Sequence, residues 1–555
     1  MTIRTLNYES LGKKAGICLV LIVAAARTWI ARYSMNADGI SYLDLSDTFR
    51  RHDWPAFVNG YWSPLYPALL GIVRSLLPSS KRWDMAGAHL TNYLIFLVAF
   101  LCFEYFYRSL RAANADRAEA NPDLLPVPEW ALWILAHGLF LWVSVDLITM
   151  AAVSPDLCVS AFVYLIAGLL LRFRSQPGWK LAALLGLALG GAYWAKAVMF
   201  PLALSFMAIA LVSTRKSRTA VRAGFAMLAC FAMVAGPLVA TLSLQKQRLT
   251  FGDSGAKNYA MFVSPGGMSR NWQGEPELGI VAKHPTRKLP SDPPIYEFAA
   301  PIGGTFPVWY DPSYWEDGRV PRFNLKAQLR TIATNLASDL ELLLHQQNCL
   351  LVALLTLILL LRRDAWRAVA GHWPVLLLCT FGMGIYVLVH TENRFVGGYI
   401  ALLWLALLTP LRVPASLQRM SAYLFLATAL AIFVGILSST ARAARDAGPN
   451  SALQDVALSD WLDGMGLHPG NRIAVIGGAG FYAARLSQVR IVAEIMDEDS
   501  IAFWRLPPEK QQSVFDAFTA TGARLILARD PSPALALDSG WIKVKGVPAY
   551  IRWLR

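Results

Sequence analysis

Charged residues are scarce in this chain. Asp, Glu, Lys and Arg make up only 16% of its 555 residues, whereas ordinary soluble proteins carry about 25%. Hydrophobic residues make up 55%, and the mean hydropathy is +0.41. These values exclude the several soluble domains that a chain of this length would otherwise suggest. Because the apolar residues lie in long runs that alternate with short basic loops, the sequence predicts a polytopic all-α membrane protein.

Cysteine is also rare, and the positions of the cysteines exclude a disulfide framework and a zinc site. No two cysteines are spaced as Cys-x-x-Cys, and all six lie inside apolar runs: Cys18, Cys102, Cys158, Cys230, Cys349 and Cys379. The sequence therefore encodes neither a disulfide framework nor a zinc site, and we expect small core residues. No cleavable signal peptide is apparent, because the first apolar run leads to Arg32 without a small-residue cleavage site, and we expect this run to stay as a signal anchor.

The chain has fewer acidic than basic residues, with 37 Asp and Glu against 51 Lys and Arg and a net charge of +14. This excess lies on short loops, where membrane insertion alone accounts for it. We therefore predict that the chain binds no nucleic acid and that its basic loops face the cytoplasmic side of a lipid bilayer.

About eleven apolar segments are each near the ~20 residues that a helix needs to cross a bilayer. Every second loop between them is basic, beginning with Arg4, Lys13 and Lys14 before the first segment, so these loops belong in the cytoplasm. The predicted spans are 15–33, 86–107, 128–146, 154–171, 181–197, 199–213, 223–244, 341–361, 374–390, 397–411 and 420–440.

The opposite loops are then extracytoplasmic, and they are long. Residues 1–444 form the predicted transmembrane domain, with outer loops at 34–85 and 245–340, and residues 445–555 form a soluble tail. The second loop is rich in Gly, Pro, Trp and Tyr, which favours an irregular but ordered segment over the membrane face. In the tail, strands predicted at 472–476, 490–494 and 524–528 alternate with helical stretches, which is typical of a small α/β domain.

The tail also contains a glycine motif. Gly478-Ala-Gly480-Phe-Tyr-Ala483 follows a predicted strand and fits G-x-G-x-x-A, with Glu494 ending the next strand where a ribose-binding acid would lie. The alternative is a tight strand-to-helix turn. We favour the turn, because the predicted topology places this domain away from cytoplasmic nucleotides and a lone glycine motif is weak.

Ionisable residues near the predicted outer ends of the spans are the candidate site residues, because each is costly in a membrane unless it is paired or wetted. Asp38 follows the first span, where the alternative role is a helix cap. Ser154-Pro155-Asp156 opens the fourth span, where a cap is again the alternative. Lys196 follows Gly190-Gly191, which permit close helix contact, and the alternative for this lysine is snorkelling to the interface.

Two further segments complete the candidate set. His390-Thr-Glu392-Asn-Arg394 fills a very short outer loop, and three ionisable side chains in so little room indicate a site. Gly60-Tyr61-Trp62-Ser63-Pro64-Leu65-Tyr66-Pro67 predicts an interfacial helix, for which an aromatic belt at the membrane surface is the alternative.

These residues come from separate segments and share one membrane face, which predicts an anionic substrate at the outer leaflet. Lys196 and Arg394 suit a phosphate, while a carboxylate such as Asp38 can accept a proton from an attacking hydroxyl. Because the site lies at lipid level, the phosphate is expected to be attached to a lipid.

The ordered motifs resemble the GT-C superfamily of membrane glycosyltransferases, in particular the bacterial branch of protein O-mannosyltransferases and lipid A aminoarabinose transferases. The motifs that carry the resemblance are Asp38-Gly-Ile-Ser-Tyr42, Ser63-Pro-Leu-Tyr66-Pro67, Ser154-Pro-Asp156, Gly191-Ala-Tyr-Trp-Ala-Lys196 and His390-Thr-Glu392-Asn-Arg394-Phe395. Each motif is weak alone, and together they cover most of residues 15–440.

The resemblance implies a GT-C-like architecture in a bacterial inner membrane and an inverting transfer of a sugar from a polyprenyl-phosphate donor to an extracytoplasmic lipid, glycan or protein. It implies that Asp38 is the base, that Asp156 is a second catalytic residue, and that Lys196, His390 and Arg394 bind the donor phosphate. The remaining site residues are Tyr42, Asp44, Tyr66 and Glu392.

Many relatives carry a second carboxylate directly after the first aspartate, where this chain has Gly39. Asp44 and Asp156 are the candidates for the missing charge. Some relatives use a divalent metal ion and others do not, so the metal requirement stays open. Two other hypotheses remain: a flippase for lipid-linked saccharides, and a membrane anchor that displays the tail as a binding module. The sequence names neither the sugar nor the acceptor.

Overall fold

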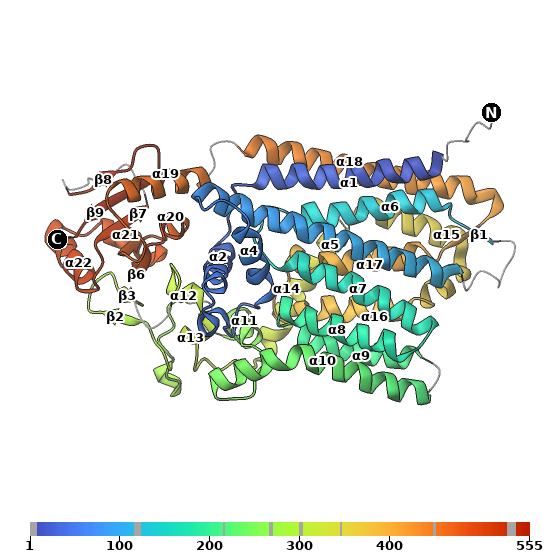
Figure 1. Cartoon of the computed structure of the whole chain (residues 1–555), viewed down its shortest axis with the longest axis horizontal. Helices are drawn as coiled ribbons and strands as arrows, with labels where there is room; N and C mark the ends of the chain where they lie inside the picture. Colours follow the sequence, from blue (N-terminus) through green and yellow to red (C-terminus); the bar gives the residue numbers. More distant parts are fainter. Residues whose placement is uncertain are drawn as a thin grey trace.

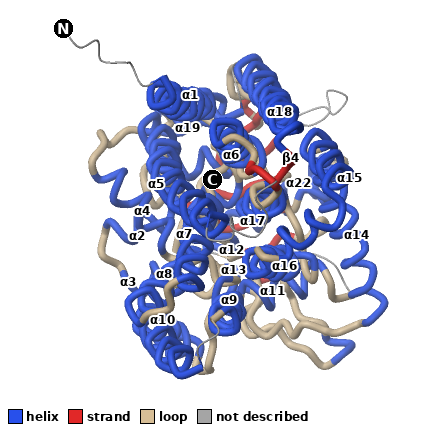
Figure 2. Tube along the Cα trace, turned by 90° about the vertical axis from the view of Figure 1, so that its right-hand side faces the viewer, coloured by secondary structure: helices blue, strands red, loops and turns tan. Residues whose placement is uncertain are grey.

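The computed structural model describes residues 8–115, 124–214, 217–265, 270–298, 303–344, 347–447, 451–529 and 540–554. Long helices run side by side along the longest axis, and a sheet with short helices covers one end of them (Figure 1). Seen along this axis, the helices form a bundle (Figure 2).

The bundle consists mainly of long apolar helices. They are α1 (Tyr8–Ala31), α5 (Lys81–Ala115), α6 (Glu129–Trp142), α7 (Asp156–Ser175), α8 (Trp179–Ala195), α9 (Met199–Ser213), α10 (Ser217–Lys246), α14 (Leu325–Leu344), α15 (Asn348–Ala370), α16 (Trp373–Val387), α17 (Asn393–Leu408) and α18 (Gln418–Asp446). A π-helical turn at Val143–Leu147 extends α6. The two-stranded sheet of β1 (Leu124–Pro126) and β4 (Arg412–Pro414) lies at the end of the bundle remote from the larger sheet.

The predicted spans all fall on helices of the bundle. Among the described residues, six helices are long and apolar enough to cross a membrane, and a bent pair of helices makes a seventh. The chain is thus a multi-pass membrane protein. The predicted span 341–361 differs, because it falls on α14 and α15, which meet at 76°. Residues 345 and 346 of that span lie outside the described residues, as does Arg4 of the orientation argument.

Glycines let α8 pack closely between two neighbouring helices. A Cβ atom added to Gly190 would lie 2.6 Å from Cβ of Val234 on α10, and one added to Gly191 would lie 2.7 Å from Cε1 of Phe162 on α7. The close helix contact predicted for this pair is confirmed, and it places the end of α8 beside α7.

Short elements fill the space between the bundle and the larger sheet (Figure 1). They are α2 (Ala37–Arg50), α3 (Trp54–Phe57), α4 (Leu65–Ser75), α11 (Ser254–Phe262), a 3-10 turn at Pro276–Leu278, α12 (Pro307–Tyr310) and α13 (Pro312–Trp315). The predicted loop 245–340 is shorter than expected, because α14 already begins at Leu325. Its Tyr and Trp side chains are buried or half-buried, which agrees with the ordered segment that its aromatic residues predicted.

The larger sheet has the strand order β2-β3-β6-β5-β7-β9-β8. Its strands are β2 (Arg287–Leu289), β3 (Ile295–Glu297), β5 (Arg472–Ile476), β6 (Arg490–Ile495), β7 (Leu525–Arg529), β8 (Ile542–Lys543) and β9 (Ala549–Trp553). The central strand β5 is parallel to β6 and β7, and the outer pairs are antiparallel. Four helices precede or connect strands of this sheet along the chain: α19 (Ser451–Gly464), α20 (Phe481–Leu486), α21 (Asp497–Trp504) and α22 (Pro508–Ala520).

The three strands predicted in the tail correspond to β5, β6 and β7. The tail does not build its sheet alone, however, since β2 and β3 come from the loop between α10 and α14 and β3 pairs with β6. Because β3 and β6 lie far apart in the sequence, local sequence patterns carry no signal of their pairing.

The glycine motif of the tail forms a tight turn between β5 and α20. Gly478 and Gly480 have φ angles of 66° and 62°, and a Cβ atom on Gly480 would collide with the side chain of Leu527. Glu494 is fully buried and accepts a hydrogen bond of 2.9 Å from Nδ2 of Asn271. The glycines therefore serve backbone geometry, and the acid is engaged within the protein.

Candidate active site

A cavity of about 510 Å³ opens where the helix bundle meets the layer of short elements. Its wall includes side chains from α2, α11, α12 and α17 and from the ends of α7, α8 and α16. Most of the predicted site residues meet there, namely Asp38, Tyr42, Asp156, Lys196, His390, Glu392 and Arg394. Tyr66 and Asp44 do not line this cavity.

Asp38 lies in the first turn of α2 and is not its cap. The helix begins at Ala37, and the residue before it, Asn36, has an extended backbone with φ −111°. Oδ1 of Asn36 accepts a hydrogen bond of 2.9 Å from the backbone N–H of Val153. The alternative role of Asp38 as a helix cap is therefore wrong, and its Oδ2 lies 3.3 Å from Nη2 of Arg394.

Asp156 and Lys196 form an ion pair between two antiparallel helices. Asp156 is the first residue of α7, is only 3% exposed, and accepts a hydrogen bond of 3.0 Å from Oγ of Ser154. Lys196 follows the last residue of α8, and its Nζ lies 2.7 Å from Oδ1 of Asp156. The same Nζ lies 3.7 Å from the centre of the Phe395 ring, so the lysine points into the site rather than snorkelling outward.

Arg394 is the centre of the cluster. Its Nε lies 2.7 Å from Oε2 of Glu392, and its Nη1 lies 3.7 Å from Oδ2 of Asp156. With the contact to Asp38, one guanidinium faces three carboxylates. The planar fork of arginine suits this arrangement, which holds residues from α2, α7 and α17 together.

Two carboxyl groups of the site respond differently to this environment. Burial raises the pKa of Asp38, and the charge of Arg394 beside it opposes the rise. Burial also acts on Glu392, but hydrogen bonds from His390 and Arg394 outweigh it and lower the pKa of Glu392 to about 2. Glu392 therefore stays ionised, whereas the carboxylate of Asp38 binds a proton more readily than an exposed aspartate does.

His390 is held by a stacking contact and an acidic neighbour. Its ring lies 4.0 Å from the ring of Phe262 on α11, with an angle of 6° between the planes. Its Nε2 lies 3.3 Å from Oε1 of Glu392. The loop between α16 and α17 is thereby fixed against the outer layer.

Aromatic side chains line another part of the cavity. Tyr61, Trp62 and Trp309 are part of the wall, and Nε1 of Trp62 donates a hydrogen bond of 3.1 Å to the carbonyl of Trp309. Nζ of Lys257 lies 4.9 Å and 4.8 Å from the ring centres of Tyr61 and Trp309. Burial lowers the pKa of Lys257 to about 8. The segment with Tyr61 and Trp62 was predicted to be an interfacial helix, with an aromatic belt as the alternative, and nothing local in the sequence marks Trp309.

A third part of the wall is apolar. Val198 and Pro201 come from the start of α9, and Ile385 and Val389 come from the end of α16 and the loop after it. The cavity therefore joins a charged cluster to an apolar surface.

The charged cluster does not fit a divalent metal ion. The described residues contain no group of three or more His, Cys, Asp or Glu that could hold a metal. Asp38, Asp156 and Glu392 converge instead on the guanidinium of Arg394, so this side chain occupies the place of a central cation.

The other two predicted site residues lie elsewhere. Tyr66 is completely buried, and its hydroxyl donates a hydrogen bond of 2.7 Å to Oδ1 of Asn92 on α5. Asp44 is buried on the other side of α2, where Oδ2 accepts hydrogen bonds of 2.8 Å from the backbone N–H and the hydroxyl of Thr305. Helical geometry explains the difference for Asp44, because a residue six positions after Asp38 points away from it at about 100° per residue.

Comparison with known proteins identifies the fold. No family model and no curated protein matches the chain. Among solved structures, ArnT from Cupriavidus metallidurans in the apo state is similar with a TM-score of 0.50 and 11% identity, over 97% of this chain and 98% of that one. ArnT bound to undecaprenyl phosphate gives a TM-score of 0.44 at 11% identity, covering 97% of both chains. The oligosaccharyltransferase of Archaeoglobus fulgidus, with Zn and sulfate, gives 0.47 at 13% identity, over 92% of this chain and 68% of that one. The chain therefore has an ArnT-like fold.

Proposed function

We propose that this protein is an inverting glycosyltransferase that moves a sugar from a polyprenyl-phosphate-linked donor to an extracytoplasmic lipid, glycan or protein. The observation that carries the proposal is the shared cavity of Asp38, Lys196 and Arg394, which also has an apolar wall. A proton acceptor, two cations and a surface for a hydrocarbon chain are the groups that such a transfer needs.

The donor phosphate is proposed to bind between Lys196 and Arg394, with His390 at the edge. Both cations already face carboxylates, so a phosphate must compete with them. The contacts of Arg394 with Asp38 and Asp156 are the ones it would displace, because they measure 3.3 Å and 3.7 Å, whereas Nε of Arg394 and Oε2 of Glu392 are 2.7 Å apart. Donor binding would thereby free Asp38 for the acceptor.

The proposed reaction is a single displacement. Asp38 takes the proton of an acceptor hydroxyl while the oxygen attacks the anomeric carbon of the sugar. The bond between that carbon and the phosphate oxygen breaks, and its electron pair leaves with the polyprenyl phosphate. Lys196 and Arg394 stabilise the charge that develops on this leaving group. The products are an inverted glycoside, a polyprenyl phosphate and a protonated Asp38 that returns its proton to water.

Asp156 and Glu392 are proposed to orient the cations, since each carboxylate contacts at least one of them. Tyr42 is proposed to shape the wall next to Asp38, where its ring packs edge-on against Trp62 with ring centres 4.9 Å apart. The site, the short elements and the tail are proposed to face the periplasm of a bacterial inner membrane, with residues 1–444 as the catalytic domain and the tail as its extracytoplasmic domain.

The test uses the full chain purified in detergent, a radiolabelled polyprenyl-phosphate sugar, and an envelope extract as the source of acceptor. The wild-type protein should release polyprenyl phosphate and label an acceptor, and Asp38→Asn should abolish both. Asp53→Asn is the matched control, because this carboxylate lies on the same outer segment but caps α3. Full turnover by Asp38→Asn removes Asp38 from the mechanism. A wild-type protein that releases no sugar in detergent but moves the intact donor across vesicles is a flippase.

A further inference from the structure

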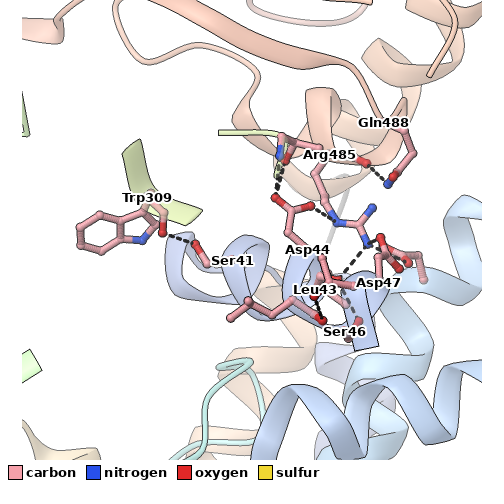
Figure 3. Close-up of polar contacts among 12 residues, drawn as sticks. Ser41, Leu43, Asp44, Ser46, Asp47, Trp309, Arg485 and Gln488 are labelled. Carbon is pink, nitrogen blue, oxygen red and sulfur yellow. Dashed lines mark hydrogen bonds and ion pairs between the residues drawn. The ribbon is translucent and has the colours of Figure 1, made fainter. Parts of the chain in front are cut away.

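We infer that Arg485, in the C-terminal tail, is a positioning residue for Asp38. The inference rests on the proposed function and gives the tail a part in donor chemistry. Arg485 lies on α20, and its side chain is only 2% exposed. Figure 3 shows its guanidinium reaching from the tail to α2. It is among the largest fully buried side chains of the protein, and such burial of a cation requires specific partners.

The partners of Arg485 are carboxylates of the membrane domain. Nε lies 3.0 Å from Oδ1 of Asp44, and Nη2 lies 2.7 Å from Oδ2 of Asp47, both on α2. Nη2 also lies 3.6 Å from Oδ1 of Asp84 in the first turn of α5. Arg74 of α4 pairs with Asp47 and Asp84 as well. Three carboxylates and two guanidinium groups thus form one buried network.

The network acts on the helix that carries Asp38. Asp38 and Asp44 lie on the same helix of 14 residues, separated by about 9 Å along its axis. Asp38 lines the cavity, whereas Asp44 and Asp47 point toward the tail. Because a short helix moves as a unit, loss of the Arg485 contacts would shift Asp38 relative to Arg394.

The outer layer of short elements also holds α2 in place. Oγ of Ser41 donates a hydrogen bond of 2.9 Å to the carbonyl of Trp309 (Figure 3). The two hydrogen bonds of Thr305 reach the same Asp44 that Arg485 contacts. The helix is therefore clamped by the tail and by the loop before α14. Neutralising one buried partner leaves the others without compensation, so the clamp depends on the charge of Arg485.

The experiment measures donor turnover for Arg485→Met and Arg485→Lys in the full chain. We expect Arg485→Met to lower kcat by about 100-fold, the effect of a misplacement near 1 Å, with the KM for the donor little changed. Arg485→Lys should recover part of kcat, because it restores the charge but not the fork. Lys81→Met is the matched control: the ion pairs that it removes join α5 to Asp460 and Asp463 of α19 and not to α2. It should keep the wild-type kcat.

Two further measurements separate positioning from folding. Asp44→Asn should lower kcat in the same direction as Arg485→Met, and the double variant should be no worse than Arg485→Met alone, because Arg485→Met already removes the contact with Asp44. A cavity of about 650 Å³ borders Asp47, Asp84 and Arg485, so free guanidinium at a concentration that does not denature the protein should rescue Arg485→Met. A loss of kcat that does not come from the missing guanidinium group would not be rescued by this addition.

Hydrogen exchange of residues 37–50 supplies a readout that does not need activity. Arg485→Met should exchange faster there than wild type, and Lys81→Met should not. Unchanged kcat and unchanged exchange in Arg485→Met would overturn the positioning role while leaving the proposed function intact. A wild-type protein without transferase activity would overturn the proposed function, and the exchange data would still decide whether Arg485 holds α2.

Discussion

Nζ of Lys196 lies 2.7 Å from Oδ1 of Asp156, although 40 residues separate them in the chain. The pair joins the first turn of α7 to the residue that ends α8, two helices that pack through Gly191. It therefore fixes one cation of the site relative to a carboxylate that also faces Arg394.

Lys196→Met should destabilise the protein and impair donor binding, whereas Lys196→Arg should keep much of both. Asp156 is 3% exposed, and a buried carboxylate that loses a charged partner costs roughly 1.5–3 kcal/mol. Thermal unfolding in detergent and the KM for the donor measure the two effects. An unchanged unfolding temperature together with an unchanged KM in Lys196→Met would contradict the pairing.

The pH dependence of transfer should follow Asp38. A base must be ionised, so kcat/KM should fall as the pH drops through the pKa of Asp38, which burial raises above its ordinary value. Arg394 lowers this pKa and Glu392 raises it. Arg394→Gln should therefore move the acid limb to higher pH, and Glu392→Gln should move it to lower pH. Identical acid limbs in all three proteins would exclude Asp38 as the titrating group.

Gly398 should be required for the approach of α17 to α7. An added Cβ would lie 2.7 Å from Oγ of Ser160, so Gly398→Ala should push the helices apart and cost roughly 1–3 kcal/mol of stability. Because α17 carries Arg394 and α7 carries Asp156, turnover should fall too. Ser160→Gly should restore both in the double variant. Gly384→Ala is the control, since an added Cβ there has no neighbour within 4 Å. A fully active, stable Gly398→Ala protein would refute this packing argument.

Cysteine labelling should establish the orientation of the chain. In a background without the native cysteines, Ser513→Cys in α22 should react with a membrane-impermeant maleimide added to spheroplasts. Ser175→Cys at the end of α7 should react only after lysis, because the positive-inside rule places this basic end in the cytoplasm. Both serines are exposed in the structure. The opposite labelling pattern would place the site on the cytoplasmic face.

Much of the fold could be predicted from local patterns. The apolar runs marked the helices of the bundle, because a helix that crosses a bilayer must be apolar along its length. The strands at 472–476 and 490–494 were visible as short buried runs between turn residues, and they correspond to β5 and β6. Strands β2 and β3 were missed because each has only three residues, and because β3 joins the sheet by pairing with β6, far along the chain.

The site was predictable to the extent that rare charges mark it. The scarcity of ionisable residues made Asp38, Asp156, Lys196 and Arg394 stand out, and all of them line one cavity. The same argument selected Asp44, which the turn of the helix directs to Arg485 instead. Trp309 and Lys257 were not found, because aromatic and basic residues are common in outer loops and only packing brings these two to the cavity.

The sequence by itself determined that the chain is a membrane protein and roughly where its helices lie. It also determined which few ionisable residues lie near the membrane, where each needs a partner or water. Each of these follows from composition and period, which are properties of short segments. Only the tertiary structure decided which charges share a cavity, that Arg394 stands at their centre, and that Arg485 of the tail reaches α2. Those relationships depend on contacts between distant segments, where helix direction and packing determine which side chains meet.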